Sequence, residues 1–183
     1  MPLWISLWIP LWMSLRSLLV ALAIAVLLVL ALAAPALASV HTYHEQPGQT
    51  TYRSRQSLRD QTDMAWQATV FKRYVGEDLQ GAYLRLVGFP GRATPDPQRP
   101  LLIETGTATQ WLAPTALDPQ TKAIPDNVAQ YDLATVLSQL LQPIPLTLVV
   151  PQAQAPASRL VVAPYVVAEW LEIWAMAEAS LAS

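Results

Sequence analysis

The sequence predicts an α+β domain in which a mostly antiparallel sheet carries two helices packed on one face or across one end. Short segments of alternating apolar and polar residues, separated by Gly and Pro, dominate residues 41–113. Apolar residues at helical spacing occur only after residue 126. An apolar run near the amino terminus ends before residue 39. We therefore expect a single domain over residues 39–183.

The apolar run covers residues 18–34 and is followed by Pro35 and the triplet Ala36-Leu37-Ala38. An apolar core followed by such a small-residue triplet is typical of a secretory signal peptide. We therefore predict a signal peptide over residues 1–38, with cleavage before Ser39, and export of the domain.

Two features of this leader allow other interpretations. Residues 1–12 contain no basic residue, which suggests an over-extended start codon. The apolar run is also nearly as long as the 20 or so residues that cross a bilayer, so an uncleaved membrane anchor is the alternative.

The strand-forming part begins with a hairpin whose arms, residues 41–45 and 50–55, flank Pro47-Gly48, with Tyr52 opposite in face to the arginines. Trp66, Ala68 and Val70 alternate with polar residues, and only Phe71 breaks this alternation. The remaining predicted strands are residues 65–74 and 82–89, which form a second hairpin, then 101–106, 107–113, 145–150 and 158–162. Loops rich in proline cover residues 90–100 and 113–126.

Two helices follow from capping signals and spacing. The first is expected to begin at Asn127, with Gln130 three residues later, and to end before Pro143. Its apolar side would be Leu133, Val136, Leu137, Leu140 and Leu141. The second opens at Pro164, with Glu169 and Glu172 facing away from an apolar stripe of Val166, Val167, Trp170, Leu171 and Trp174.

Composition excludes several classes of function. The chain has no cysteine, so it has no disulfide partner and no thiolate metal site. Its formal net charge of −2 gives no general attraction for phosphates, so we expect no nucleic-acid partner. The sequence carries no phosphate-binding glycine loop, no G-x-S-x-G and no H-E-x-x-H, so we expect no cofactor and no catalytic residue.

Histidine offers one hypothetical metal site. His41 and His44 point to opposite faces of a regular strand, so they cannot chelate one metal together. Cleavage after Ala38 would place His41 third from a free amine, an arrangement that can bind Cu(II) or Ni(II) in a square plane. Chance produces this arrangement often, and we predict no metal site from it.

A cluster of basic residues is the main candidate site. Between Thr51 and Arg73 lie Arg53, Arg55, Arg59, Lys72 and Arg73, and eight basic residues fall between Arg53 and Arg99. Arg53 and Arg55 share one face of a strand. The sequence from Ser57 to Asp60 resembles a helix-starting box that would bring Arg59 near Asp60 and Asp63.

The cluster has two interpretations. In one, the charges belong to a solvated turn and pair with one another at about 0.2–1 kcal/mol each. In the other, they form a basic patch that docks an acidic protein partner. The candidate residues of that patch are Arg53, Arg55, Arg59, Arg73 and Arg85.

Tryptophans allow a competing hypothesis. Trp66, Trp111, Trp170 and Trp174 fall at strand and helix positions that are typical of core packing. They could instead line a pocket between the sheet and the carboxyl-terminal helix, as in a lipid or pigment carrier.

Seven segments together resemble a known family: "HTYHE", "YRSRQSLRDQ", "AWQ", "FKR", "LRLVGFPG", "NVAQYDL" and "VVAEW", which span residues 41–170. The chain resembles a cyanobacterial family of exported proteins, with relatives in plant plastids, that is catalogued as a domain of unknown function. The resemblance implies export to the periplasm or the thylakoid lumen. It implies no activity and assigns no catalytic residue.

These observations leave the function unknown and support three hypotheses. The first is a small soluble exported accessory protein that binds another protein, such as a photosynthetic membrane complex. The second is the lipid or pigment carrier. The third, and the least favoured, is a hydrolase of unfamiliar design, because no nucleophile and base are paired in the sequence.

Overall fold

The computed structural model describes Leu22 and residues 41–46, 48–116 and 124–181. All the elements described below belong to one compact unit, Ala38–Ser183. Apart from Leu22, the predicted signal peptide lies outside the described residues, as do residues 39 and 40 of the copper motif. None of the described helices combines the length and the apolar character needed to cross a membrane.

Nine strands and two helices are named in this part of the chain, in an α+β arrangement that confirms the predicted fold class. A five-stranded sheet, called sheet A, has the strand order β1-β2-β3-β4-β7, and a four-stranded sheet, called sheet B, has the order β6-β5-β8-β9. All pairs are antiparallel. The strands of sheet A are β1 (His41–Gln46), β2 (Gln49–Arg59), β3 (Ala65–Val75), β4 (Asp78–Val87) and β7 (Val128–Asp132). Those of sheet B are β5 (Leu101–Glu104), β6 (Gln110–Ala113), β8 (Leu146–Val150) and β9 (Ser158–Val162), and the helices are α2 (Ala134–Gln139) and α3 (Pro164–Leu181).

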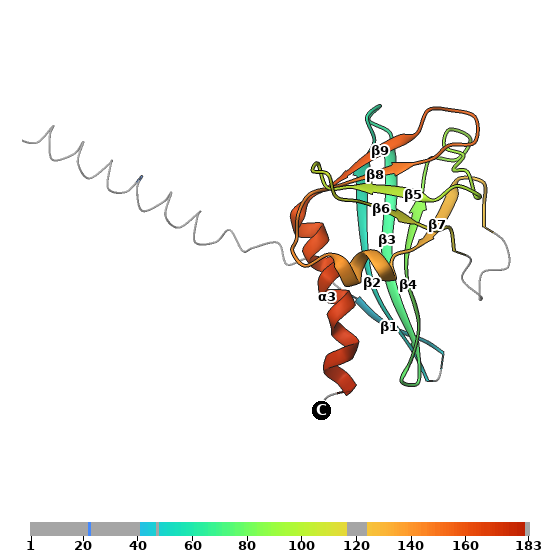
Figure 1. Cartoon of the computed structure of the whole chain (residues 1–183). Coiled ribbons are helices and arrows are strands. Elements are labelled where there is room, and N and C mark those ends of the chain that lie inside the picture. Colours follow the sequence, from blue (N-terminus) through green and yellow to red (C-terminus); the bar gives the residue numbers. More distant parts are fainter. Residues whose placement is uncertain (1–21, 23–40, 47, 117–123, 182–183) are drawn as a thin grey trace, which may run out of the picture. The chain divides into compact units, whose positions relative to one another are not determined.

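The two sheets cross and join at two places. Figure 1 shows sheet B running across the upper part of β2, β3 and β4, with α3 alongside the lower part of these long strands. A bridge between Asp60 and Leu160 joins the end of β2 to β9, and a bridge between Thr115 and Tyr131 joins β7 to the segment after β6. These links hold the two sheets face to face.

The core lies between the sheets, on the face of sheet A that we call the inner face. Alternation places Leu58, Trp66, Val70 and Leu84 on this face, where each is buried, as predicted for the two β3 residues. Sheet B and the helices contribute further core side chains: Ile103, Leu148, Leu160, Val136, Leu137, Val167 and Trp170. Burying a large apolar side chain stabilises the folded state by roughly 1.5–3 kcal/mol. The apolar residues of these strands therefore face the core, and the residues that alternate with them point to the opposite, outer face of sheet A.

The predicted strands and both predicted hairpins are present, but the first predicted helix is wrong in extent. Residues 128–132 form β7, with Gln130 opposite Arg85 in β4. The helix α2 begins only at Ala134 and ends at Gln139, and Leu141 is 88% exposed. The cap-like pair Asn127 and Gln130 is a local signal, and the pairing of this segment with β4 outweighs it.

Two further expectations are wrong. No helix starts at Ser57, because Ser57 belongs to β2 and Asp60 begins the turn to β3. Glu169 does not face away from the fold, because its side chain turns toward sheet A and is only 3% exposed. The predicted start of α3 at Pro164 and the exposure of Glu172 are confirmed.

Candidate basic interface on the outer face of sheet A

All five candidate arginines point to the outer face of sheet A, opposite the core, and strand register groups four of them. Arg53 lies opposite Phe71, and Phe71 lies opposite Tyr83. In the next cross-strand row Arg55 lies opposite Thr69, and Thr69 opposite Arg85. Arg73 follows Phe71 by two residues on β3, so its side chain points to the same face. The arginines therefore lie around Phe71, and the row of Arg53, Phe71 and Tyr83 ends at Asp132 of β7.

Arg59 is not part of this group. It lies at the far end of β2, opposite Ala65, and its Nη1 is 3.2 Å from the carboxylate of Asp63. Both side chains of this ion pair are more than half exposed, so the pair contributes no more than about 1 kcal/mol. The expected approach of Arg59 to Asp63 is confirmed, although a turn produces it and no helix does. Arg59 fits the solvated-turn interpretation.

Lys72, the remaining basic residue of the sequence cluster, lies on the inner face. It is 2% exposed and donates a hydrogen bond to the backbone carbonyl of Trp174 in α3. Its Nζ lies 4.4 Å from the centre of a Trp174 ring and 5.4 Å from the Tyr74 ring. This lysine holds α3 against the sheet and contributes nothing to the outer face.

Phe71 is the residue that sequence analysis missed. It is an apolar residue on the outer face, yet only 5% of its surface is exposed. The guanidinium carbons of Arg73 and Arg85 lie 5.5 and 5.4 Å from the centre of its ring, within the range of cation–π attraction. Its break of the alternation in β3 was the signal that could have identified it.

Tyr83 completes the aromatic centre of the face. Its ring lies 5.3 Å from the Phe71 ring, and its hydroxyl donates a hydrogen bond to the carbonyl of Gln80 at 3.0 Å. The ring lies back over Gly81, where an added Cβ would come within 2.5 Å of the Tyr83 ring. Gly81 also has a φ of 146°, so only glycine suits this position.

Gln130 in β7 borders the face on the side of Arg85. Its Oε1 accepts hydrogen bonds from Arg85 Nε at 2.9 Å and from Nη2 at 2.7 Å. Gln130 is 3% exposed, and its Nε2 has no hydrogen-bond partner among the described residues. A buried amide donor without an acceptor costs about 1–3 kcal/mol. A ligand oxygen that reached this atom would therefore be stabilised.

The space between sheet A and α3 is filled by side chains. Ser54 Oγ donates to Glu169 Oε2 at 2.5 Å, and Gln56 Nε2 donates to both oxygens of the same carboxylate at 2.9 and 3.0 Å. Trp66 and Trp170 are each 1% exposed, which confirms that they pack in the core. Among the described residues, none that lines the pocket described next comes from α3.

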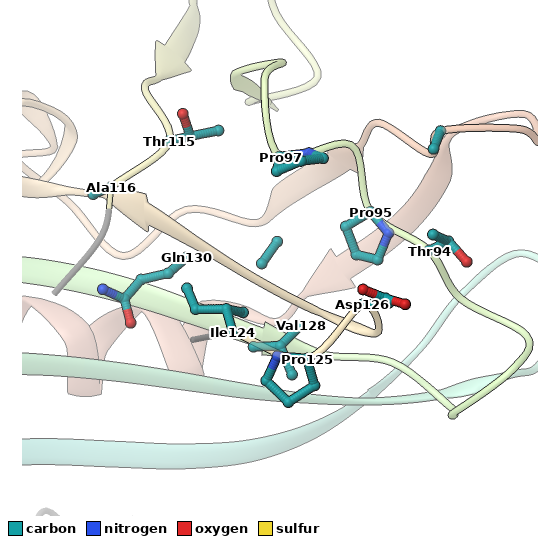
Figure 2. Close-up of a pocket in the computed structure, with 12 residues that line it drawn as sticks. Thr94, Pro95, Pro97, Thr115, Ala116, Ile124, Pro125, Asp126, Val128 and Gln130 are labelled. Atoms are coloured by element: carbon teal, nitrogen blue, oxygen red, sulfur yellow. The ribbon is translucent and has the colours of Figure 1, made fainter. Parts of the chain in front are cut away.

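A pocket of about 490 Å³ lies at the β7 edge of sheet A. Figure 2 shows its walls, with Gln130, Ile124 and Val128 on one side and Pro95 and Pro97 of the 90–100 loop on the other. Among the described residues, Asp126 adds a carboxylate to the pocket lining. Its volume falls in the range of small-ligand pockets, about 300–1,000 Å³.

Two titratable groups outside the arginine face have shifted pKa values. Burial raises the pKa of Asp60, but hydrogen bonds from Thr62, Trp66 and Met64 together lower it below its usual value. Burial, followed by the negative charge of Asp96, raises the pKa of Tyr131 well above its usual range. In the part of the chain described here, no three His, Cys, Asp or Glu side chains lie close enough to hold a metal ion.

Comparison with known proteins gives one match. A family model described as "Protein of unknown function (DUF3122)" matches residues 38–173. No curated protein and no solved structure matches the chain. The cyanobacterial source and the export that the sequence suggested stay predictions.

Proposed function

The chain belongs to this family of unknown function, DUF3122, and we propose that it is a binding protein whose outer face of sheet A docks an acidic segment of another protein. The observation that carries the proposal is the convergence of Arg53, Arg55, Arg73 and Arg85 on one sheet face around an aromatic pair. We call this set of six residues, the four arginines with Phe71 and Tyr83, the arginine face.

Arginine stacked on an aromatic ring is suited to bind carboxylates. A guanidinium group is planar and carries several N–H donors whose geometry matches the two oxygens of a carboxylate. Stacking also limits the rotamers of the side chain, so less entropy is lost when a carboxylate binds. Arginine and aromatic residues are also enriched among the residues that dominate interface energies. The guanidinium groups of Arg73 and Arg85 lie over the Phe71 ring.

Charge distribution supports a protein partner over a nucleic acid. The chain as a whole has a formal charge of −2, so a long polyphosphate would be repelled by the rest of the surface. A short acidic segment needs only the local positive field of the arginine face. On this face Arg55 is exposed, and Arg53 and Arg85 are half-buried.

The location of the protein bears on the partner, and the packing under α3 bears on the carrier alternative. The apolar run of residues 18–34 supports export, and in the periplasm or thylakoid lumen the partner would be a protein such as an exposed part of a photosynthetic membrane complex. A carrier with its pocket under α3 has less support, because Glu169, Lys72 and Trp170 occupy that space. A hydrolase has no supporting geometry in the described residues.

The test is binding of a fluorescent hexaglutamate peptide to the full-length protein, followed by fluorescence anisotropy. The double variant Arg53→Glu/Arg55→Glu should weaken binding at least tenfold. The control Arg92→Glu/Arg99→Glu changes the net charge equally at two exposed loop residues and should bind within twofold of wild type. If both variants weakened peptide binding equally, the effect would come from the net charge of the protein and not from the arginine face. That result would contradict the proposal. Tighter binding of single-stranded DNA or of anionic vesicles than of the peptide would contradict the choice of partner.

A further inference from the structure

The β7 edge of the arginine face continues directly into the 490 Å³ pocket. Val128 and Gln130 are cross-strand neighbours of Val87 and Arg85, so they belong to the outer face of sheet A, and both also line the pocket. Gln130 is hydrogen-bonded to Arg85 and forms the border between the two. A chain segment bound on the arginine face therefore reaches the pocket at Gln130.

The walls of the pocket are suited to apolar side chains. Three prolines, Pro95, Pro97 and Pro125, line it together with Ile124 and Val128. Proline rings are stiff and have no backbone N–H, so they form a preformed apolar surface that loses little entropy when it is covered. At about 490 Å³ the pocket is large enough for more than one aliphatic side chain.

The charges of the two neighbouring regions differ in sign. Among the described residues that line the pocket, the charged one is Asp126, whereas the adjoining sheet face carries Arg85 and Arg55. An acidic side chain is therefore attracted to the arginine face and repelled from the pocket. An apolar side chain is stabilised when it leaves water and enters the pocket, and it is stabilised little on the arginine face.

We propose that the pocket is the apolar anchor site of the same docking surface, and that the partner segment carries large aliphatic side chains directly beside its carboxylates. This inference rests on the proposed function and adds the chemistry of the partner to it. Carboxylates of the segment contact the arginine face. The aliphatic side chains fill the pocket between the proline walls.

The test uses three fluorescent peptides and the full-length protein. The first has three glutamates followed directly by three leucines, the second replaces the leucines with serines, and the third replaces the glutamates with glutamines. The first should bind at least tenfold more tightly than either of the others. Because apolar burial and charge attraction contribute separately, removing either should reduce the affinity.

Variants of the pocket test whether the leucine side chains of the peptide bind there. Ala153 lines the pocket and is exposed, so Ala153→Trp should block the pocket and abolish the advantage of the leucine peptide. Ala155→Trp, in the same loop but outside the pocket lining, is the matched control and should leave the advantage unchanged. Ile124→Glu is a second blocking variant, and circular dichroism of each variant checks that it is folded.

Each other outcome overturns a defined part of the account. Equal binding of the leucine and serine peptides, with loss of both in Arg53→Glu/Arg55→Glu, would disprove the anchor site and leave the acidic docking face intact. Binding of the glutamine peptide as tightly as the first would show an independent apolar ligand site and disprove the shared surface. No binding of any peptide would disprove the proposed function, and the anchor site with it.

Discussion

The guanidinium carbon of Arg85 lies 5.4 Å from the centre of the Phe71 ring on the outer face of sheet A. The two residues are on different strands, and the register of β3 and β4 brings them together. Arg85 is held from its other side by Gln130 of β7. Three strands therefore fix one guanidinium, and this fixed position is what makes the face a candidate for carboxylate binding.

Replacing Phe71 should weaken the arginine face without unfolding the protein. Phe71→Leu keeps an apolar side chain but removes the ring, so the cation–π attraction to Arg73 and Arg85 is lost. Each of these contacts stabilises the position of its arginine by about 0.5–1 kcal/mol. We expect three- to tenfold weaker binding of the hexaglutamate peptide, measured by fluorescence anisotropy. Phe89→Leu, at a 59% exposed phenylalanine, is the control and should change nothing. Unchanged affinity in Phe71→Leu would show that the ring has no part in binding.

Gly81→Ala should be among the most destabilising single-methyl substitutions in this sheet. The added Cβ would come within 2.5 Å of the Tyr83 ring, and the φ of 146° is unfavourable for alanine. We expect a loss of about 2–4 kcal/mol in the free energy of unfolding, measured by urea denaturation. Gly76→Ala, which has a φ of 60° but no neighbour within 4 Å of the new methyl, should lose only about 1 kcal/mol. Similar losses in both variants would show that Tyr83 is free to move away from Gly81.

Asp60 should make stability depend on acid pH. Its Oδ1 accepts from Thr62 N at 2.9 Å, Thr62 Oγ1 at 2.7 Å and Met64 N at 3.0 Å, and its Oδ2 accepts from Trp66 Nε1 at 3.2 Å. Burial raises its pKa, but these bonds give a net pKa below the usual 3.8. The carboxylate therefore stabilises the fold fully above 3.8, and this contribution is lost as the pH falls through the lower pKa of the folded state.

The measurement for Asp60 is the urea unfolding free energy of wild type and of Asp60→Asn between about pH 7 and pH 2. The neutral amide cannot titrate, so the difference between the two proteins should be largest near pH 7 and should shrink as the pH falls below 3.8. A difference that stayed constant or grew on acidification would contradict the role of the ionised carboxylate.

Glu169→Ala should destabilise the packing of α3 on sheet A. It removes the acceptor of Ser54 Oγ and of Gln56 Nε2, and Ser54 is only 1% exposed, so its hydroxyl cannot turn to water. We expect a loss of about 2–4 kcal/mol in thermal or urea denaturation. Glu172→Ala, at an exposed glutamate on the same helix, should stay within about 0.5 kcal/mol of wild type. Equal effects at both positions would contradict this assignment.

Local patterns in the sequence predicted the structural features that a single strand determines, such as which residues share a face. Alternation in β2 and β3 is sufficient to place Arg53 and Arg55 on one face and Trp66 and Val70 on the other. The approach of Arg73 and Arg85 to Phe71 depends on the register between strands, which no single segment contains. The arginine group could therefore be proposed from the sequence, but not its aromatic centre.

The wrong predictions have the same origin. Gln130 has the spacing of a helix-capping residue, and only its pairing with Arg85 on β4 shows that it belongs to a strand. Glu169 has the polarity of a solvent-exposed helix position, and Ser54, its partner, is 115 residues away in sequence. The pocket combines residues from three loops and β7, so no local pattern indicates it.

Photo-crosslinking in an extract of the source organism tests the docking face most directly. A photoreactive residue placed at Gln67, an exposed position on the outer face of sheet A, should crosslink to an acidic segment of another protein, identified by mass spectrometry. The same residue at Gln98, exposed in the 90–100 loop, should give no such adduct. Loss of the Gln67 adduct in Arg53→Glu/Arg55→Glu would support the account. Adducts only from Gln98, or a Gln67 adduct that survives the charge reversal, would contradict it.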